Sequence, residues 1–250
     1  GTGKITTLGG NITQQQSPVN LDKYTTALTD LQTKSKYWSE LPANGVFISR
    51  DEHFTGNRVE LLAGDDDCLQ VFHLEHDDLD FRDFGTLIQL DSTLSCKTVL
   101  INVAASADGI VTIANIAKFI DPFGNTDFDF DSDVTANILW NFYNATDTVV
   151  LGDGLLGNGQ FRGSVVVPFG DVNITFPGHS GRMIVAGDLC MDVAGGELYN
   201  YEFDPICPLP VPEDCPSAMN GRLGMFELDV PVAAAAMPMP LSVEHKNLRG

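Results

Sequence analysis

The pattern of apolar residues changes near Pro42. Before this point apolar side chains recur about every 3.6 residues, which predicts one amphipathic helix of about 20 residues with Ser17 and Pro18 at its start. Its apolar face consists of Leu21, Tyr24, Leu28, Leu31 and Trp38. No other segment has so long a helical pattern, and this face must dock on a larger body.

After Pro42 the chain consists of short apolar runs bounded by Gly, Asp, Asn or Ser, which is typical of strands joined by tight turns. From residue 137 onward the runs follow one another at about 8 to 12 residues. The predicted strands are residues 46–49, 58–62, 69–74, 86–90, 98–103, 110–119, 138–142, 148–151, 163–168, 172–176, 182–186 and 198–203.

Gly163, Gly181 and Gly187 separate the later runs as corners would separate stacked strands. This favours a mainly β fold, a right-handed β-helix or solenoid with the one long helix packed alongside, because short strands bury their inward residues only when neighbouring coils cover them. A Greek-key sandwich would show a similar spacing of glycines between short strands. Periodicity leaves both architectures open.

The chain is expected to form one β-solenoid domain over residues 1–207, of which residues 4–11 look like a remaining strand fragment. Residues 208–250 are expected to be a proline-rich extension, with one added strand near residues 224–230. The longest weakly polar run, residues 230–241, contains three prolines and is far shorter than the roughly 20 residues that cross a bilayer. We therefore predict no transmembrane segment.

Charge narrows the class of partner. The chain carries 34 acidic and 14 basic side chains, a formal net charge of −20. Nucleic acid and anionic membranes are poor partners, because binding them requires clustered Lys and Arg. The hydrophobic fraction of 43% is nevertheless that of a folded protein.

The cysteines favour an exported protein. Their spacing fits no zinc site, and disulfides persist mainly outside the cytosol. We expect Cys68 to pair with Cys96 and two of the three later cysteines to pair together, although the sequence alone leaves the pairing open. The five are Cys68, Cys96, Cys190, Cys207 and Cys215. Glycosylation sequons at Asn11, Asn144 and Asn173 point the same way.

A candidate cation site lies in an acidic segment. Asp127, Asp129, Asp131 and Asp133 alternate with other residues and would lie on one side of an extended chain. Such carboxylates repel unless neutralised, and Ca²⁺ takes 6 to 8 oxygen ligands. An EF-hand does not fit, because Ile138 stands where its bidentate Glu belongs. The alternative is a solvated acidic loop.

Catalytic motifs are weak. His73 and His76 would point to opposite faces of a strand, which argues against one shared metal. His179 and Ser180 are adjacent on a turn and cannot easily act as base and nucleophile. Among 34 acidic residues, no pair for glycoside cleavage can be chosen from sequence. We therefore expect no enzymatic activity and assign no catalytic residue.

Four phrases, in order, resemble the choice-of-anchor A family, a module of surface and adhesive proteins. They are Leu139-Trp140-Asn141-Phe142 with the following Asn144-Ala145-Thr146, Gly163-Ser164-Val165-Val166-Val167-Pro168, Gly181, and Gly196-Glu197-Leu198-Tyr199-Asn200-Tyr201 with Phe203. The similar region spans about residues 21–203. Tyr199 stands where the family usually has His, and the Gly-rich strands that normally precede the helix are nearly absent.

The resemblance implies a β-helix-like domain flanked by a helix and displayed outside the cell for adhesion to a surface, glycan or matrix protein, without catalysis. It implies structural roles for the motif residues Trp140, Asn141, Phe142, Gly163, Pro168, Gly181, Glu197 and Asn200. On alternation, Trp140 and Phe142 should enter the core while Asn141 faces away or pairs with a neighbouring Asn.

Two alternatives stay open. One is a carbohydrate-active β-helix, a polysaccharide lyase or hydrolase with a calcium-assisted acidic groove. It requires basic residues beside carboxylates, and the 14 Lys and Arg are mostly scattered. The other is ice binding, which needs threonines repeated at coil spacing, and the threonines of this chain do not repeat in that way.

Overall fold

The computed structural model describes residues 22–52, 56–79, 86–114, 116–126, 130–153, 160–192 and 196–212. Strands predominate in these ranges. The helices are α1 (Asp22–Ser39), the 3-10 helix η1 (Ser92–Leu94) and α2 (Ser132–Ala136). The strands are β1 (Val46–Glu52), β2 (Gly56–Leu62), β3 (Leu69–Leu74), β4 (Thr86–Leu90), β5 (Thr98–Val103), β6 (Val111–Ala114), β7 (Ile116–Ile120), β8 (Ile138–Asn141), β9 (Thr148–Asp153), β10 (Gln160–Arg162), β11 (Ser164–Val167), β12 (Asp171–Ile174), β13 (Gly178–Ser180), β14 (Met183–Val185), β15 (Leu189–Met191) and β16 (Glu197–Tyr199).

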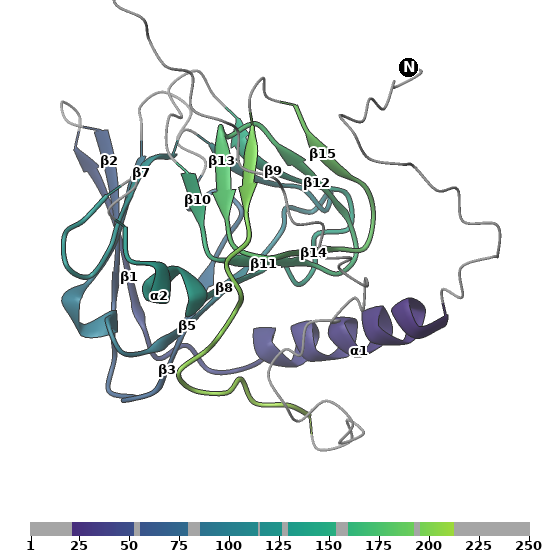
Figure 1. Ribbon diagram of the computed structural model, residues 1–250, viewed down its shortest axis with the longest axis horizontal. Helices are drawn as coiled ribbons and strands as arrows, with labels where there is room; N and C mark the ends of the chain where they lie inside the picture. Colours follow the sequence, from purple (N-terminus) through teal and green to yellow (C-terminus); the bar gives the residue numbers. More distant parts are fainter. Residues whose placement is uncertain are drawn as a thin grey trace, which may run out of the picture.

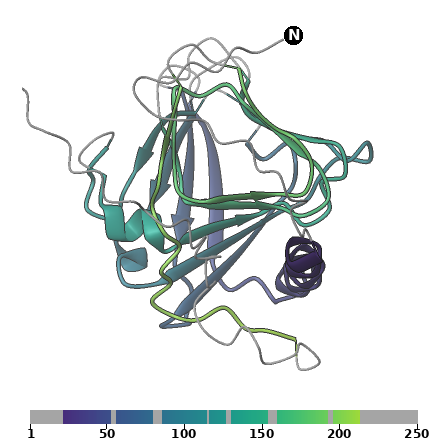
Figure 2. The same ribbon diagram turned by 45° about the vertical axis from the view of Figure 1, so that its right-hand side comes forward.

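Consecutive strands in the second half enter three different sheets in turn. Each strand from β11 to β16 pairs in parallel with the strand three places earlier. We call β8–β10, β11–β13 and β14–β16 three-strand layers. The layers enclose a three-sided outline, with α1 seen end-on outside one side (Figure 2).

The strands of the described ranges form four sheets, ordered β14-β11-β8-β5-β3, β15-β12-β9-β6, β10-β13-β16 and β1-β2-β4-β7. The prediction of a mainly β fold with a helix alongside is confirmed at this level. A regular β-helix along the whole chain is not confirmed, because β1 and β2 pair antiparallel and β2, β4 and β7 lie in a separate sheet.

The main core lies inside the layers. Aromatic rings stack through it: the Phe161 ring lies 5.1 Å from Trp140, 5.6 Å from Phe119 and 5.9 Å from Phe176, measured between centroids. Trp140 and Phe142 are buried here, as the alternation of the LWNF phrase predicts. Edge-to-face and offset contacts of this kind add to the free energy gained from burying the rings.

A second core lies between α1 and the sheet β14-β11-β8-β5-β3. From the helix, Leu31 and Trp38 pack against side chains of this sheet, and Phe203 joins them. All residues of β5, β8 and β11 are therefore buried, on the inner face by the main core and on the outer face by the helix (Figure 1). The observed helix begins at Asp22, and the expected cap at Ser17 and Pro18 lies outside the described residues.

After β16, residues 200–212 form a segment without helix or strand that we call the C-terminal strap. It runs back from the last layer toward the first strands. Its backbone N–H at Asp204 donates to Ala136 O before β8, and Cys207 N donates to Thr98 Oγ1 at the start of β5. Trp38 Nε1 donates to Pro210 O at 2.8 Å.

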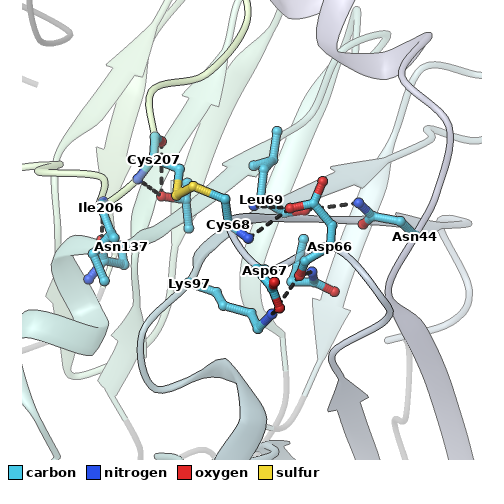
Figure 3. The surroundings of a disulfide bond; sticks show 11 residues. Asn44, Asp66, Asp67, Cys68, Leu69, Lys97, Asn137, Ile206 and Cys207 are labelled. Carbon is cyan, nitrogen blue, oxygen red and sulfur yellow. Dashed lines mark hydrogen bonds and ion pairs between the residues drawn. A yellow bond between two sulfur atoms is a disulfide. The ribbon is translucent and has the colours of Figure 1, made fainter.

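A disulfide fastens the strap. Cys207 is bonded to Cys68, 139 positions earlier and directly before β3 (Figure 3). The expected Cys68–Cys96 pair is wrong. The expected pair among the three later cysteines is wrong as well, because Cys207 bonds to Cys68 and Cys190 is free. Cys96 and Cys190 are free and exposed, while Cys215 lies outside the described residues.

Three strands were missed by the periodicity analysis: β10, β13 and β15, each of three residues. In addition, the run 110–119 contains two strands that belong to different sheets, and the run 198–203 is a strand only as far as Tyr199. Runs this short carry too few alternating positions to show a period.

Candidate functional site

The two large parallel sheets differ on their outer sides. Helix α1 covers β14-β11-β8-β5-β3, whereas the outward residues of β15-β12-β9-β6 are half-buried or exposed. We call the outer side of β15-β12-β9-β6 the open face; its sheet lies away from α1 (Figure 1). Parallel sheets are usually covered on both faces, so an open one marks a surface available for a partner.

Alternation along the strands builds the open face. Val149 and Leu151 of β9, like Val172 and Ile174 of β12, are buried in the main core. The residues between them point outward and lie in register across the sheet. The central row is Thr112, Val150, Asn173 and Cys190.

The charge of the open face is negative. The charged residues of the four strands and the turns before them are aspartates, with no Lys or Arg in residues 105–114, 145–152, 170–174 and 187–192. Asp147, Asp171 and Asp188 are exposed near the starts of the strands. Asp171 Oδ1 accepts from Asp188 N at 2.8 Å and so links two layers. A neutral strip with an acidic border results.

Two sequons fall on or beside this face. Asn173 belongs to the outward row of β12 and is half-buried, and its buried Oδ1 has no hydrogen-bond partner in the described ranges. Asn144 is exposed in the turn after β8, where its Oδ1 accepts from Ala105 N at 2.7 Å. Asn11 lies outside the described residues. Glycosylation stays a prediction, and a glycan on Asn173 would obstruct the open face.

Asn141 of the LWNF phrase lies on the helix side of its sheet. Its Nδ2 donates to Asn102 Oδ1 at 2.8 Å and to Ser35 O at 2.9 Å, and its Oδ1 accepts from Ser35 Oγ at 2.5 Å. Asn102 Nδ2 in turn donates to Trp38 O. These buried groups fix the position of α1 on the sheet.

The motif glycines occupy stacked corners. Gly163 has φ +100° and Gly181 has φ +148°. A Cβ on Gly163 would lie 2.6 Å from the Ile138 side chain, and one on Gly181 would lie 2.2 Å from Gly163 O. Only glycine fits where corners approach this closely.

The other motif residues lie apart from the open face. Pro168 is buried, and its carbonyl accepts from Gln32 Nε2 of α1 at 2.9 Å. Glu197 and Asn200 are exposed around β16, and the Tyr199 hydroxyl donates to Glu197 Oε2. None of these side chains gathers with another into a site in the described ranges.

His179 is buried inside the last two layers, 1% exposed, with its ring stacked on Phe161 at 5.8 Å. In the described part of the chain neither ring nitrogen has a hydrogen-bond partner. Burial lowers the pKa of His179 to about 4; the backbone of Arg182 opposes this shift only in part, and the charge of Arg162 adds to it. The imidazole is therefore neutral at pH 7 and plays a packing role.

The predicted calcium segment is only partly described. Asp127 and Asp129 lie outside the described residues. Asp131 caps α2, its Oδ1 accepting from Asp133 N at 2.7 Å, and Asp133 is exposed in the first turn. Within the described ranges, no group of three or more His, Cys, Asp or Glu could hold a metal ion. The site stays a prediction, with a calcium-dependent melting temperature as its signature.

Asp121 organises the loop before this segment. Burial acts to raise the pKa of Asp121, but hydrogen bonds from Asn125 and from the backbone of Phe123 and Asp131 outweigh it and hold the pKa below its usual value. This carboxylate was not singled out from the sequence. The segment contains several other aspartates, and nothing in the sequence distinguishes Asp121 from them.

The sequence analysis also missed the open face. Alternation within residues 148–151 and 172–176 shows which side chains face away from a core. It does not show that another element leaves these side chains uncovered, because that depends on which sheet α1 docks against. A signal could have come from the absence of Lys and Arg around these strands.

Neither α-helix in the described ranges has the length and apolar character of a membrane-spanning helix. No curated protein and no solved structure matches the chain significantly. The model of one family, described as "Putative Ice-binding-like adhesive domain", matches residues 1–198, a range that includes α1 and nearly all of β16. This match supports the adhesive domain expected from the sequence, although it does not name choice-of-anchor A. The chain belongs to this family of ice-binding-like adhesive domains.

Proposed function

We propose that the chain is a non-catalytic adhesion module of a cell-surface or secreted matrix protein and that the open face is its binding surface. One observation carries this proposal. Of two large parallel sheets, one is covered by α1, while the other presents the row Thr112, Val150, Asn173 and Cys190 outward. The family assignment gives adhesion as the matching activity.

The chemistry of the open face favours a broad, neutral or cationic target. A surface with no Lys or Arg in its strands and with Asp147, Asp171 and Asp188 along its border repels anionic polymers at low salt. The small and branched side chains of the central row permit close approach of a partner. An extracellular glycan, a matrix protein or a mineral surface offers such a target.

The proposal also includes the detailed architecture that the sequence predicts. We infer a β-helix of the choice-of-anchor A type over residues 1–207, with residues 208–250 as an extension. The parallel pairing of β11–β16 with strands three places earlier supports the repeat. An exported location is supported by the Cys68–Cys207 disulfide, since such bonds persist in oxidising compartments.

The test is a comparison of two matched pairs of variants. Thr112→Arg and Asn173→Arg place a long cation on the open face, whereas Thr29→Arg and Thr33→Arg place it on exposed positions of α1. Binding of the purified full chain to cells, matrix-coated plates and mineral particles is measured with the melting temperature. We expect the face variants to bind about tenfold more weakly, or worse, with little change in stability.

Equal binding by the face and helix variants would reject the open face as the adhesive surface. A chain that binds none of the surfaces but cleaves a polysaccharide would reject the adhesive function itself and favour the carbohydrate-active alternative.

A further inference from the structure

The two sequons in the described part of the chain lie in different surroundings. Asn144 is exposed in the turn between β8 and β9, whereas Asn173 lies within β12, inside the sheet β15-β12-β9-β6. We propose that Asn144 is N-glycosylated, that Asn173 stays unmodified, and that the first sugar lies against Phe169 in the neighbouring turn. A glycan is bulky and is accommodated where a surface turn presents the asparagine.

The side-chain amide of Asn144 has its two ends in different places. Its Oδ1 accepts from Ala105 N at 2.7 Å, a hydrogen bond to the turn after β5. This bond holds the carbonyl end against the stack and leaves Nδ2, the atom that receives the sugar, at the exposed end. A glycosylated amide keeps its carbonyl oxygen as an acceptor. The modification therefore breaks no hydrogen bond of this oxygen.

The rest of the Asn144 sequon is also accessible. Thr146, whose hydroxyl the transferring enzyme recognises together with the asparagine, is exposed, and Ala145 between them is buried. Ala145 N donates to Phe142 O at 3.4 Å, which closes a β-turn with Asn144 at its third position. The buried alanine thus anchors a turn that presents both recognised side chains to solvent.

The Asn173 sequon is held in a sheet. Asn173 pairs with Val150 of β9 on one side and with Cys190 of β15 on the other. Its Oδ1 is buried, and the Thr175 hydroxyl donates to Gly152 O. A transferase reaches this sequon only when β12 separates from its neighbours, which costs the hydrogen bonds of two ladders. We therefore expect Asn173 to stay unmodified, which leaves the open face uncovered.

An exposed aromatic side chain lies beside the Asn144 turn. Phe169 belongs to the turn after β11 and is 41% exposed. The next residue, Gly170, approaches the Asn144 turn closely, since a Cβ on Gly170 would lie 2.8 Å from Ala145 O. Phe169 therefore lies in the turn adjacent to that of Asn144. The C–H face of an N-acetylglucosamine ring packs on aromatic rings, and covering Phe169 removes apolar surface from water.

The transfer requires a lipid-linked oligosaccharide as the sugar donor. A bond forms between Asn144 Nδ2 and C1 of the first sugar, while the bond from C1 to the lipid diphosphate breaks. The diphosphate leaves with the electron pair, and a base of the oligosaccharyltransferase takes the proton from Nδ2. Donor and enzyme act on exported chains, in keeping with the Cys68–Cys207 disulfide.

The experiment adds a purified single-subunit oligosaccharyltransferase and its lipid-linked donor to the purified full chain. Trypsin cleaves after Lys118, Arg162 and Arg182, so the two sequons fall on separate peptides. Removal of the glycan by peptide-N-glycosidase in heavy-oxygen water labels each modified asparagine for mass spectrometry. We expect Asn144 to carry about tenfold more label than Asn173, or more. Equal labelling, or no label at Asn144, would overturn the proposal.

Unfolded peptides separate the effect of the fold from that of the local sequence. One peptide contains residues 141–150 and the other residues 170–179, each with one sequon. Both should be modified at similar rates, because neither asparagine is held in a sheet. If the second peptide is as poor an acceptor as Asn173 in the full chain, local sequence explains the difference and the structural argument fails.

The contact with Phe169 is tested by melting temperatures before and after transfer. We expect the glycan to raise the melting temperature by about 2–4 °C and Phe169→Ala to remove at least about half of this gain. Phe123→Ala, at a residue that is 62% exposed, is the matched control and should retain the gain. Thr146→Ala removes the sequon and controls for the treatment. An equal gain in the Phe169 and Phe123 variants would overturn the contact, and no readout depends on binding by the open face.

Discussion

The side-chain amide of Asn141 donates to Asn102 Oδ1 at 2.8 Å, joining β8 and β5 beneath α1. Both residues are buried. The other hydrogen-bonding atoms of their side-chain amides bond to Ser35 and to Trp38 O of the helix. An apolar pair could fill the same space without setting the axial position of the helix. The amide pair does set it, because the hydrogen bonds form only when Ser35 and Trp38 lie opposite the two asparagines.

Removing one member of this pair should be costly. Asn141→Leu removes the partner of the buried Asn102 Oδ1 and of the buried Ser35 hydroxyl, so we expect the free energy of unfolding to fall by about 2–4 kcal/mol in urea titrations. The exposed Asn200→Leu is the matched control, with an effect within about 0.5 kcal/mol. A similar loss in both variants would show that the buried network adds nothing specific.

Loss of the disulfide should destabilise the chain and release the strap. For Cys207→Ser we expect a loss of roughly 3–5 kcal/mol, because the bond closes a very long loop in the unfolded chain. Cys190→Ser, at an exposed free cysteine, should have little effect. Peptide mapping without reduction should recover the Cys68–Cys207 peptide; recovery of Cys68 joined to Cys96 would contradict the structure.

The corner glycines permit a controlled comparison. Gly163 and Gly124 both have positive φ, but a Cβ on Gly163 meets Ile138, and one on Gly124 meets nothing within 4 Å. Gly124→Ala should therefore cost about 1 kcal/mol from backbone strain alone, while Gly163→Ala should cost roughly 2–4 kcal/mol. Thermal melts compare them, and equal losses would show that crowding at the corner is relieved by small shifts.

Acid should weaken the fold in two separate windows. The folded-state pKa of His179 is about 4 against 6.5 when unfolded, so the unfolded chain binds more protons between these values. The free energy of unfolding should thus fall as the pH drops from 6.5 to 4, by about 3 kcal/mol at most. Asp91 and Asp121, whose pKa values are lowered, add their loss only below the unfolded value of 3.8.

The His179 contribution can be isolated by substitution. His179→Gln should flatten the pH dependence of urea unfolding between pH 6.5 and 4, even if it lowers stability at every pH. The exposed Asn200→Leu, which alters no ionisable group, should leave the slope unchanged. An unaltered slope in the His179 variant would show that this residue gains no proton on unfolding.

How far the sequence predicts the fold depends on how each strand is buried. Residues 69–74, 86–90 and 98–103 form strands with the expected bounds, since their apolar runs reflect a sheet packed against the core. Strand β13 was missed, because its Gly-His-Ser sequence is polar and is buried only through Phe161 and the layers around it. The open face depends on helix docking, a long-range relationship that local periodicity does not contain.

The strap gives the layered stack a particular response to force. Tension applied at the C-terminal side of residue 212 meets the Cys68–Cys207 bond and the Trp38 contact before it reaches β16. The load enters beside β3, near the opposite end of the stack, and the last strands are not peeled off one after another. Under such tension the domain would yield only when the covalent bond is reduced or many strand pairs shear together.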